Sequence, residues 1–305
     1  MQVKAFSYLT ILSLSALLVL GGCASKEERD QRRAERLRKT ERELYETSQR
    51  QLRTQQWEAA IQNLQALEEN FPFGTYAEQA QLELLFAYYK NYDFDAVIAN
   101  ADRFIRLHPR HRNADYAYYL QGLASFEIRG GGLDRFTSVD ASKRDVDAAT
   151  QAFAYFSQLL SLYPDSPYTA DAEKRMIYLR NLMARHQIHV ANYYLKRGAY
   201  IAAINRGRYV LENFQQTPAV PDALAVVAQG YKLLNMDDLV NSTLAILKDN
   251  YPQHPAFDAD GSFDFQFQST GERSWIDIAT FGLFDKAEPP GFDSREVFNP
   301  QYQAK

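Results

Sequence analysis

The chain has 305 residues and a net charge of −4, with charged residues making up 24% of its length. This length is ample for a sizeable core and long for one compact globule. Because there is no basic excess, nothing in the composition indicates a nucleic-acid partner. Tyrosine (20) and phenylalanine (19) are abundant while tryptophan (2) is scarce, which indicates packed aromatic cores or aromatic-lined binding surfaces.

The first 22 residues have the pattern of a secretory signal peptide. A short basic start is followed by an apolar run over residues 5–20 and by small residues before Cys23, the only cysteine. The run is short for a transmembrane helix, the alternative interpretation, which needs about 20 apolar residues. The ending Leu20-Gly21-Gly22-Cys23 resembles the bacterial lipoprotein signal, in which the cysteine is acylated and becomes the first residue of the mature protein.

This resemblance implies that residues 1–22 are removed and that Cys23 carries an N-acyl group and an S-diacylglycerol lipid, with no other cofactor. Two or more acyl chains hold a protein stably at a membrane. Ala24 follows the cysteine where lipoproteins of the inner membrane usually have Asp, which implies the outer membrane and its periplasmic face. Once Cys23 is acylated, the chain has no thiol left for catalysis, a disulfide or a metal.

The segment after the cysteine is nearly all charge, because residues 26–43 contain 8 basic and 6 acidic side chains. We assign residues 23–40 to the acylated cysteine and a charged linker, which is a solvated spacer or a helical extension that lifts the domain off the bilayer. The alternative is attraction to anionic lipid headgroups, which so small a basic excess supports only weakly.

Amphipathic helices recur over residues 41–252. Apolar residues fall at positions i, i+3, i+4 and i+7 upstream of the pairs Phe71-Pro72, His108-Pro109, Tyr163-Pro164 and Tyr251-Pro252. Proline ends a helix because it lacks an amide hydrogen and its ring clashes with the preceding turn. The spacing is that of helix-turn-helix units with the tetratricopeptide period of about 34 residues. We therefore predict an all-α fold, an α-solenoid of five tetratricopeptide-like repeats whose stacking supplies the core.

The third predicted repeat carries an insertion at residues 129–145, and the fourth has an unusually long first helix. Residues 253–305 form an aromatic C-terminal extension with irregular structure and one short helix at residues 274–284. Its apolar side chains predict docking onto a partner or onto the repeats, or contact with lipid. The helices of the five repeats are expected over residues 41–54 and 57–70, 76–91 and 94–107, 113–128 and 146–162, 168–197 and 200–213, and 221–234 and 237–250.

No motif for chemistry stands out, and the sequence has no nucleophile elbow, phosphate-binding loop or dinucleotide fingerprint. The triplet Gly130-Gly131-Gly132 favours a flexible loop over a phosphate cradle. His108 with His111 and His186 with His189 are i, i+3 pairs, but neither is accompanied by the glutamate base of a zinc-protease helix. We predict no catalytic residues, no metal site and no enzymatic activity.

What remains is surface, and the first two repeats offer the best candidate for binding a peptide. Stacked helix pairs form a concave groove suited to extended segments, and aromatic rings give large contact area at low entropic cost. The alternative for these aromatic residues is packing in the core; adjacent Tyr88 and Tyr89 point about 100° apart, so both cannot face the core equally. The candidate residues are Phe71, Pro72, Phe73, Gly74, Tyr76, Tyr88, Tyr89 and Lys90.

The chain resembles the BamD family, the repeat lipoproteins of the machinery that assembles β-barrel proteins in the outer membrane. The likeness covers about residues 40–252. It departs from the family at Thr75, where relatives often have proline, and in the long aromatic tail. The matching segments include Phe71-Pro72-Phe73-Gly74, Ala87-Tyr88-Tyr89-Lys90-Asn91, Tyr163-Pro164-Asp165-Ser166, Arg197-Gly198-Ala199 and Asn205-Arg206.

The resemblance implies a non-catalytic scaffold of the outer-membrane β-barrel assembly (BAM) complex. Its C-terminal repeats would bind a POTRA domain of the barrel protein BamA, through Asn205 and Arg206, and the other BAM lipoproteins. Arg206 would donate a charge-assisted hydrogen bond to an acidic POTRA residue; the alternative is an ordinary solvated arginine. The N-terminal repeats would capture the aromatic-ended C-terminal strand of unfolded outer-membrane proteins and promote their folding and insertion.

Two other hypotheses stay open. One is another repeat-type lipoprotein, such as a secretin pilotin or a regulator of a cell-wall enzyme, against which the matching aromatic segments argue. The other, from a different class, is a periplasmic metal-dependent hydrolase.

Overall fold

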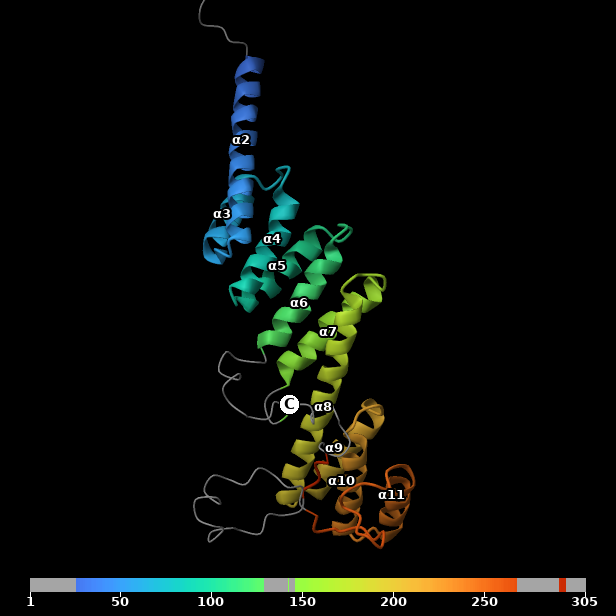
Figure 1. Ribbon diagram of the computed structural model, residues 1–305. Helices are drawn as coiled ribbons and strands as arrows, with labels where there is room; N and C mark the ends of the chain where they lie inside the picture. Colours follow the sequence, from blue (N-terminus) through green and yellow to red (C-terminus); the bar gives the residue numbers. More distant parts are fainter. Residues whose placement is uncertain (1–25, 129–141, 143–145, 268–290, 295–305) are drawn as a thin grey trace, which may run out of the picture. The chain divides into compact units, whose positions relative to one another are not determined.

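The computed structural model describes residues 26–128, 142, 146–267 and 291–294, and every regular element in these ranges is a helix (Figure 1). The all-α class and the packing of consecutive helices into repeat-like pairs, both predicted from the sequence, are confirmed. Within the ranges described, no helix is both long enough and apolar enough to span a bilayer. The helices are α2 (Lys26–Arg53), α3 (Trp57–Asn70), α4 (Ala77–Lys90), α5 (Phe94–Leu107), α6 (Ala114–Ile128), α7 (Asp147–Leu162), α8 (Thr169–Lys196), α9 (Tyr200–Asn213), α10 (Val220–Leu233) and α11 (Asp237–Asn250).

The helix boundaries differ from those expected by at most one residue, except at the N-terminus. There α2 begins at Lys26, so most of the charged linker belongs to the first helix of the first repeat. Of the two forms considered for this linker, the structure has the helical extension. Cys23 and most of the insertion, including its glycine triplet, lie outside the described residues.

The aromatic-proline pairs mark a turn that recurs at the end of each repeat. The first residue after the second helix of each repeat donates its N–H to the carbonyl four residues earlier over 2.8 Å; these residues are Phe71, His108, Tyr163, Phe214 and Tyr251. The residue three positions further on then donates its N–H back to the carbonyl of that capping residue. The turn therefore ends the second helix of each repeat, and after the first four repeats it leads into the next helix.

A second recurrent turn joins the two helices inside a repeat. Its residue two positions before the second helix has a positive φ: 59° at Gln55, 62° at Tyr92, 73° at Gly198 and 57° at Asn235. A side chain disfavours this left-handed conformation, whereas glycine adopts it freely. One of these four turns has glycine at that position and one has asparagine, which also tolerates this conformation, whereas Gln55 and Tyr92 adopt it against their intrinsic preference.

The chain divides into two compact units, the first ending at Ala96 and the second beginning at Val97, with the boundary inside α5. In the first unit α3 packs against both α2 and α4. Its buried residues are Ala60, Ile61, Leu64 and Leu67, which have the helical spacing that the sequence showed.

In the second unit the 28-residue helix α8 packs against α7, α9 and α10, as Figure 1 shows. Helix α10 is the most enclosed, because every residue from Pro221 to Gly230 is buried. Helices α9 and α10 approach closely at two glycines. A Cβ atom at Gly207 would lie 2.7 Å from Val227, and one at Gly230 would lie 2.5 Å from Ile204.

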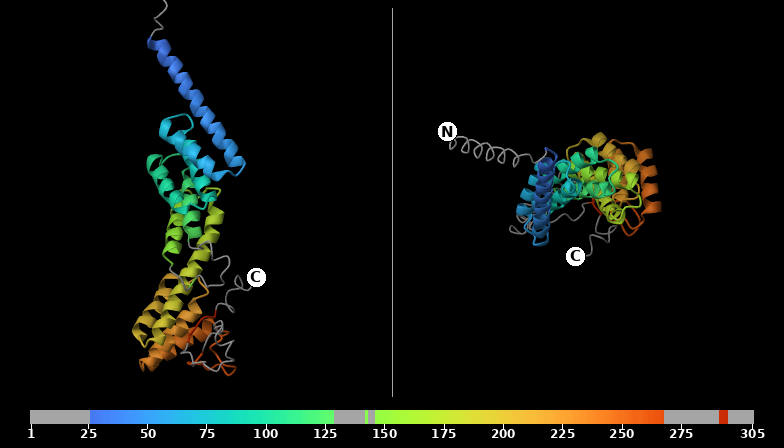
Figure 2. Two further views of the ribbon diagram at one scale, coloured as in Figure 1. Left: turned by 90° about the vertical axis from the view of Figure 1, so that its left-hand side faces the viewer. Right: turned by 90° about the horizontal axis from the view of Figure 1, so that it is seen from above.

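The C-terminal extension contributes to the core of this second unit. Ala256 and Phe292 are both fully buried and belong to the cluster that includes Ala203, Leu224 and Leu247 of the repeats. Figure 2 shows the orange and red segments that follow α11 lying against this end of the unit. Of the three roles considered for the tail, docking onto the repeats is the one that its described part shows. The short helix expected at residues 274–284 lies outside the described residues.

Candidate functional site

The predicted peptide site begins at the turn between α3 and α4. Phe73 is 100% exposed there, Pro72 is exposed, and Phe71 and Gly74 are partly covered. The Gly74 N–H donates to the Phe71 carbonyl over 2.9 Å, so the backbone of the turn is closed on itself. The turn thus presents one whole aromatic ring to solvent, where a partner can reach it.

A buried carboxylate of α2 accepts a hydrogen bond from the backbone of this turn. Glu41 of α2 is 4% exposed, and its Oε1 accepts the N–H of Tyr76 over 2.9 Å. A Cβ atom at Gly74 would lie 2.2 Å from the same oxygen, so any larger residue would displace the carboxylate. The glycine in the turn is a sequence signal for close approach, but only the fold identifies Glu41 as the approaching group.

Tyr76 belongs to a polar and aromatic network between α2 and α4. Its ring stacks on that of Tyr45, with centroids 4.3 Å apart and planes at 13°. The Tyr45 hydroxyl donates to Glu83 over 2.9 Å, and Gln79 and Gln49 donate to the same carboxylate. Burial raises the pKa of Glu83 above its usual value and outweighs these neutral hydrogen bonds, which lower it. Burial and the Glu83 charge together raise the pKa of Tyr45.

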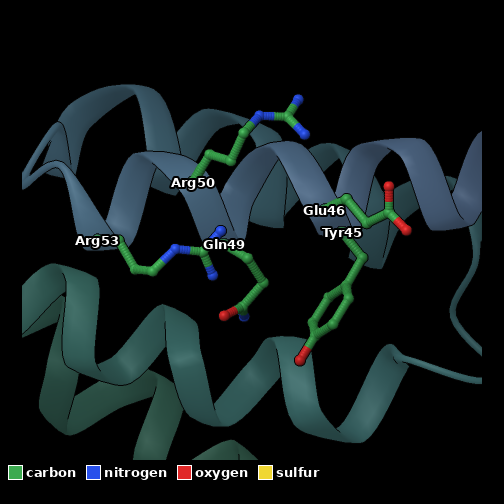
Figure 3. Close-up of a pocket in the computed structure, with 5 residues that line it drawn as sticks. All are labelled: Tyr45, Glu46, Gln49, Arg50 and Arg53. Carbon is green, nitrogen blue, oxygen red and sulfur yellow. The ribbon is translucent and has the colours of Figure 1, made fainter.

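The same face of α2 borders a cavity of about 320 Å³. Figure 3 shows Tyr45 and Gln49 pointing toward α4 while Arg50 points away from it. Arg50 donates to Thr47 over 2.8 Å. A guanidinium group beside an aromatic ring can hold a carboxylate in two-pronged fashion. The residues lining the cavity are Tyr45, Glu46, Gln49, Arg50 and Arg53.

The structure separates the three candidate residues at the end of α4. Tyr88 is 8% exposed and its hydroxyl accepts a 2.7 Å hydrogen bond from Gln65, so core packing describes this side chain. Tyr89 is half-buried, with its ring 5.8 Å from that of Phe94. Lys90 is exposed. Only the latter two offer surface to a ligand, as the 100° offset between adjacent residues requires.

The second candidate site is on α9 of the second unit. Asn205 and Arg206 are both exposed, and Arg206 Nη1 donates to Gln187 Oε1 of α8 over 2.9 Å. An amide orients the guanidinium without neutralising it, so its charge stays available to an acidic partner.

A buried charged cluster, which sequence reasoning missed, lies in the second unit. Asp222 of α10 is 0% exposed; it accepts a hydrogen bond from Arg185 of α8, and His254 Nε2 lies 3.2 Å from it. Burial alone would raise the pKa of Asp222, but the Arg185 charge and His254 outweigh it and lower the pKa to about 2. Although this cluster is polar and buried, no three ligating side chains in the described ranges are placed to hold a metal ion. The histidines of the two pairs contact other groups: the rings of His108 and His111 lie 5.0 and 5.3 Å from that of Phe104, and His186 Nδ1 lies 2.9 Å from the Ser142 carbonyl.

An array of helical pairs with an exposed aromatic turn defines a binding scaffold of the tetratricopeptide-like class. Comparison with known proteins sharpens this class, because residues 38–246 match the YfiO family, described as outer membrane lipoprotein. The chain belongs to this family.

Three relatives share the name outer membrane protein assembly factor BamD. The one from Neisseria meningitidis serogroup B is 37% identical over 245 residues, which are 80% of this chain and 92% of the relative. The one from Vibrio cholerae is 35% identical over 245 residues, 80% of this chain and 98% of the relative. The one from Pasteurella multocida is 31% identical over 249 residues, 82% and 92% of the two chains. The resemblance inferred from the aromatic segments is confirmed, and the family is one of assembly factors rather than enzymes.

Proposed function

We propose that the protein is a lipid-anchored scaffold of the BAM complex, with a substrate site in its first unit and a BamA site in its second. The relatives' shared name supports the general role, because the matches extend over most of both chains. The observation that carries the substrate site is the Phe71–Tyr76 turn, which holds an entirely exposed Phe73 over a buried Glu41.

The ligand of this first site is the C-terminal strand of an unfolded outer-membrane protein. Phe73 and the stacked rings of Tyr45 and Tyr76 offer apolar contact to its aromatic residues. Along α2 the distance from Glu41 to Arg53 is about 18 Å at 1.5 Å per residue. An extended segment of about five or six residues spans this length, and Arg53 would then pair with its terminal carboxylate.

The test is the affinity of the mature protein for a fluorescent peptide of about ten residues that ends in phenylalanine. Phe73→Ala and Arg53→Glu are each expected to weaken binding at least about tenfold, a loss of about 1.4 kcal/mol. Amidation of the peptide's C-terminus should remove the effect of Arg53→Glu. The control is Ile201→Ala, at a residue 66% exposed in the second unit, which should bind normally. Unchanged binding by Phe73→Ala would refute the site.

The BamA site is tested by a charge reversal. Arg206→Glu should reduce co-purification of BamA, because it places like charges together at the interface. Arg208→Glu is the matched control, since Arg208 is exposed on the same helix and pairs with Glu212 of that helix. Equal BamA recovery with both variants would mean that Arg206 does not contact BamA.

The anchor is tested separately at Cys23. Cys23→Ser should leave the protein unacylated, so that it fractionates with soluble periplasmic proteins. Retention of this variant in the membrane fraction would refute the lipid anchor.

A further inference from the structure

The backbone of residues 291–294, the docked segment, forms hydrogen bonds with side chains of the repeats. The Asn192 side chain of α8 donates to the Phe292 carbonyl over 2.8 Å and accepts the Phe292 N–H over 3.1 Å. Two residues later, the Ser294 N–H lies 3.0 Å from both carboxylate oxygens of Asp222. Hydrogen bonds to the backbone of an extended segment are one of the ways in which proteins bind peptides.

The side chains of Phe292 and Asp293 in the docked segment have different kinds of contact. Phe292 is fully buried, and its ring stacks on Phe263 and Phe267 at centroid distances of 5.8 and 6.0 Å. Asp293 pairs with Arg185 Nη1 over 2.9 Å. Residue 291 is glycine, but a Cβ atom there would contact nothing within 4 Å. The contacts therefore select an aromatic residue followed by an acidic one, with little demand on the residue before them.

The charged residues on the receptor side contact one another as well as the docked segment. Asp222 and Arg185 pair directly between α10 and α8, and His254 contacts the same carboxylate. The Ser294 N–H adds to a carboxylate that Arg185 has already neutralised, so the segment's departure would leave no unpaired buried charge.

The end of the array also departs from the repeat pattern at this place. His254 has the same position in its turn as Gly74, His111, Ser166 and Thr217 have in the four preceding turns. Each of those turns leads into another helix, whereas the fifth leads into the tail. The last repeat is therefore covered by extended chain, whereas the fourth repeat packs through α9 on the following helix α10.

We propose that Asn192, Asp222 and Arg185, with the aromatic pocket of Phe263 and Phe267, form a peptide-recognition site specific for an aromatic-acidic pair. Residues 291–294 are its intramolecular ligand. A partner's extended segment with the same pattern binds only when the docked segment leaves, because a tethered ligand has a high effective concentration. This site is separate from the substrate and BamA sites above and does not depend on them.

The test uses the mature full-length chain and a fluorescent peptide of residues 288–297. Phe292→Ala combined with Asp293→Ala opens the site, and the opened protein should bind the peptide at least about tenfold more tightly than wild type. Asn192→Ala in the opened protein should abolish this gain. A peptide in which the phenylalanine and aspartate are exchanged should not bind. Gln266→Ala, at an exposed tail residue beside the site, is the control and should behave as wild type.

Asp293→Asn alone keeps the buried ring of Phe292 and should displace the docked segment less completely. The affinity of this variant for the peptide should therefore lie between those of wild type and the double variant. Circular dichroism checks that each variant is folded. Failure of the folded Asp293→Asn and double variants to bind would make the docked segment a fixed part of the core and overturn the proposal. Equal binding by wild type and opened protein would also overturn it, because the peptide would not compete for this site.

Discussion

Each unit of the molecule contains a carboxylate whose pKa burial tends to raise, and the net pKa shifts of the two go in opposite directions. Glu83 in the first unit accepts hydrogen bonds from Tyr45, Gln49 and Gln79, all neutral, and burial raises its pKa. Asp222 in the second unit is more deeply buried, yet its pKa falls to about 2 because Arg185 compensates its charge. At Glu83 the neutral donors do not outweigh burial, whereas at Asp222 the charge of Arg185, together with His254, does. At the candidate peptide site Glu83 therefore accepts hydrogen bonds from neutral partners, whereas Asp222 forms a charged pair that also binds the tail.

The largest effect on the difference between Glu83 and Asp222 should come from removing the Arg185 cation. Arg185→Ala leaves Asp222 buried without its main counter-charge, and we expect a loss of about 3–5 kcal/mol in the free energy of unfolding. The control is Arg208→Ala, which removes an exposed pair with Glu212 and should cost no more than about 0.5 kcal/mol. Urea denaturation followed by circular dichroism measures both. Similar losses from the two variants would show that the buried pair is not an anchor.

Acid should weaken the second unit through Asp222. Its folded pKa is about 2 against an ordinary value of 3.8, so the carboxylate stabilises the fold above pH 4. This contribution, about 2 kcal/mol, is lost as the pH falls from about 4 through 2. The measurement is the free energy of unfolding between pH 6 and 2, for wild type and Asp222→Asn. The variant starts less stable and should lose less on acidification; an equal loss would exclude Asp222 as the source.

Replacing a glycine with alanine should destabilise the protein more at Gly74, in the turn of the first unit, than at Gly291, at the start of the docked segment. Gly74→Ala forces the Glu41 carboxylate away and leaves the Tyr76 N–H without its acceptor. Loss of such a buried hydrogen bond costs about 1–3 kcal/mol. Gly291→Ala meets nothing within 4 Å and should leave stability unchanged. Thermal unfolding compares the two variants, and an equal shift would mean that Glu41 moves aside at no cost.

Glu83 should show the opposite pH dependence to Asp222. Because its folded pKa is raised, its favourable contribution is present below its ordinary pKa of 4.5 and is lost as the pH rises through the folded value. Glu83→Gln removes this loss, so the variant should gain stability relative to wild type on going from pH 4 to 7. The fluorescence of Trp57 on α3, in a Trp275→Phe background, follows unfolding of this unit. A wild-type protein that grows more stable over this range by the same amount as the variant would contradict the assignment.

The sequence predicts local structure well and long-range approach poorly, for a physical reason. Helical periodicity and proline act within a few residues, so the ends of α3, α9 and α11 could be predicted to the residue. The hydrogen-bonded residues are far apart in the sequence. Glu41 and Tyr76 are separated by 35 positions, Asn192 and Phe292 by 100, and Asp222 and Ser294 by 72. No local pattern distinguishes these polar residues from solvated ones, because their partners are set by the stacking of the repeats. Even the offset of Tyr88 from Tyr89 shows only that one must turn from the core, and the fold decides which.

The smallest effect on stability should come from Phe73, and this makes it the cleanest probe of function. Its ring is fully exposed, so Phe73→Ala removes no buried apolar area and should change the free energy of unfolding by no more than about 0.5 kcal/mol. Phe104 in the second unit is the matched contrast, since it is 2% exposed and Phe104→Ala should cost about 3–5 kcal/mol. Chemical denaturation compares the two variants. If Phe73→Ala also destabilised the protein by more than 1 kcal/mol, the ring would pack against the protein in solution, and a loss of peptide binding by that variant could no longer be assigned to direct contact.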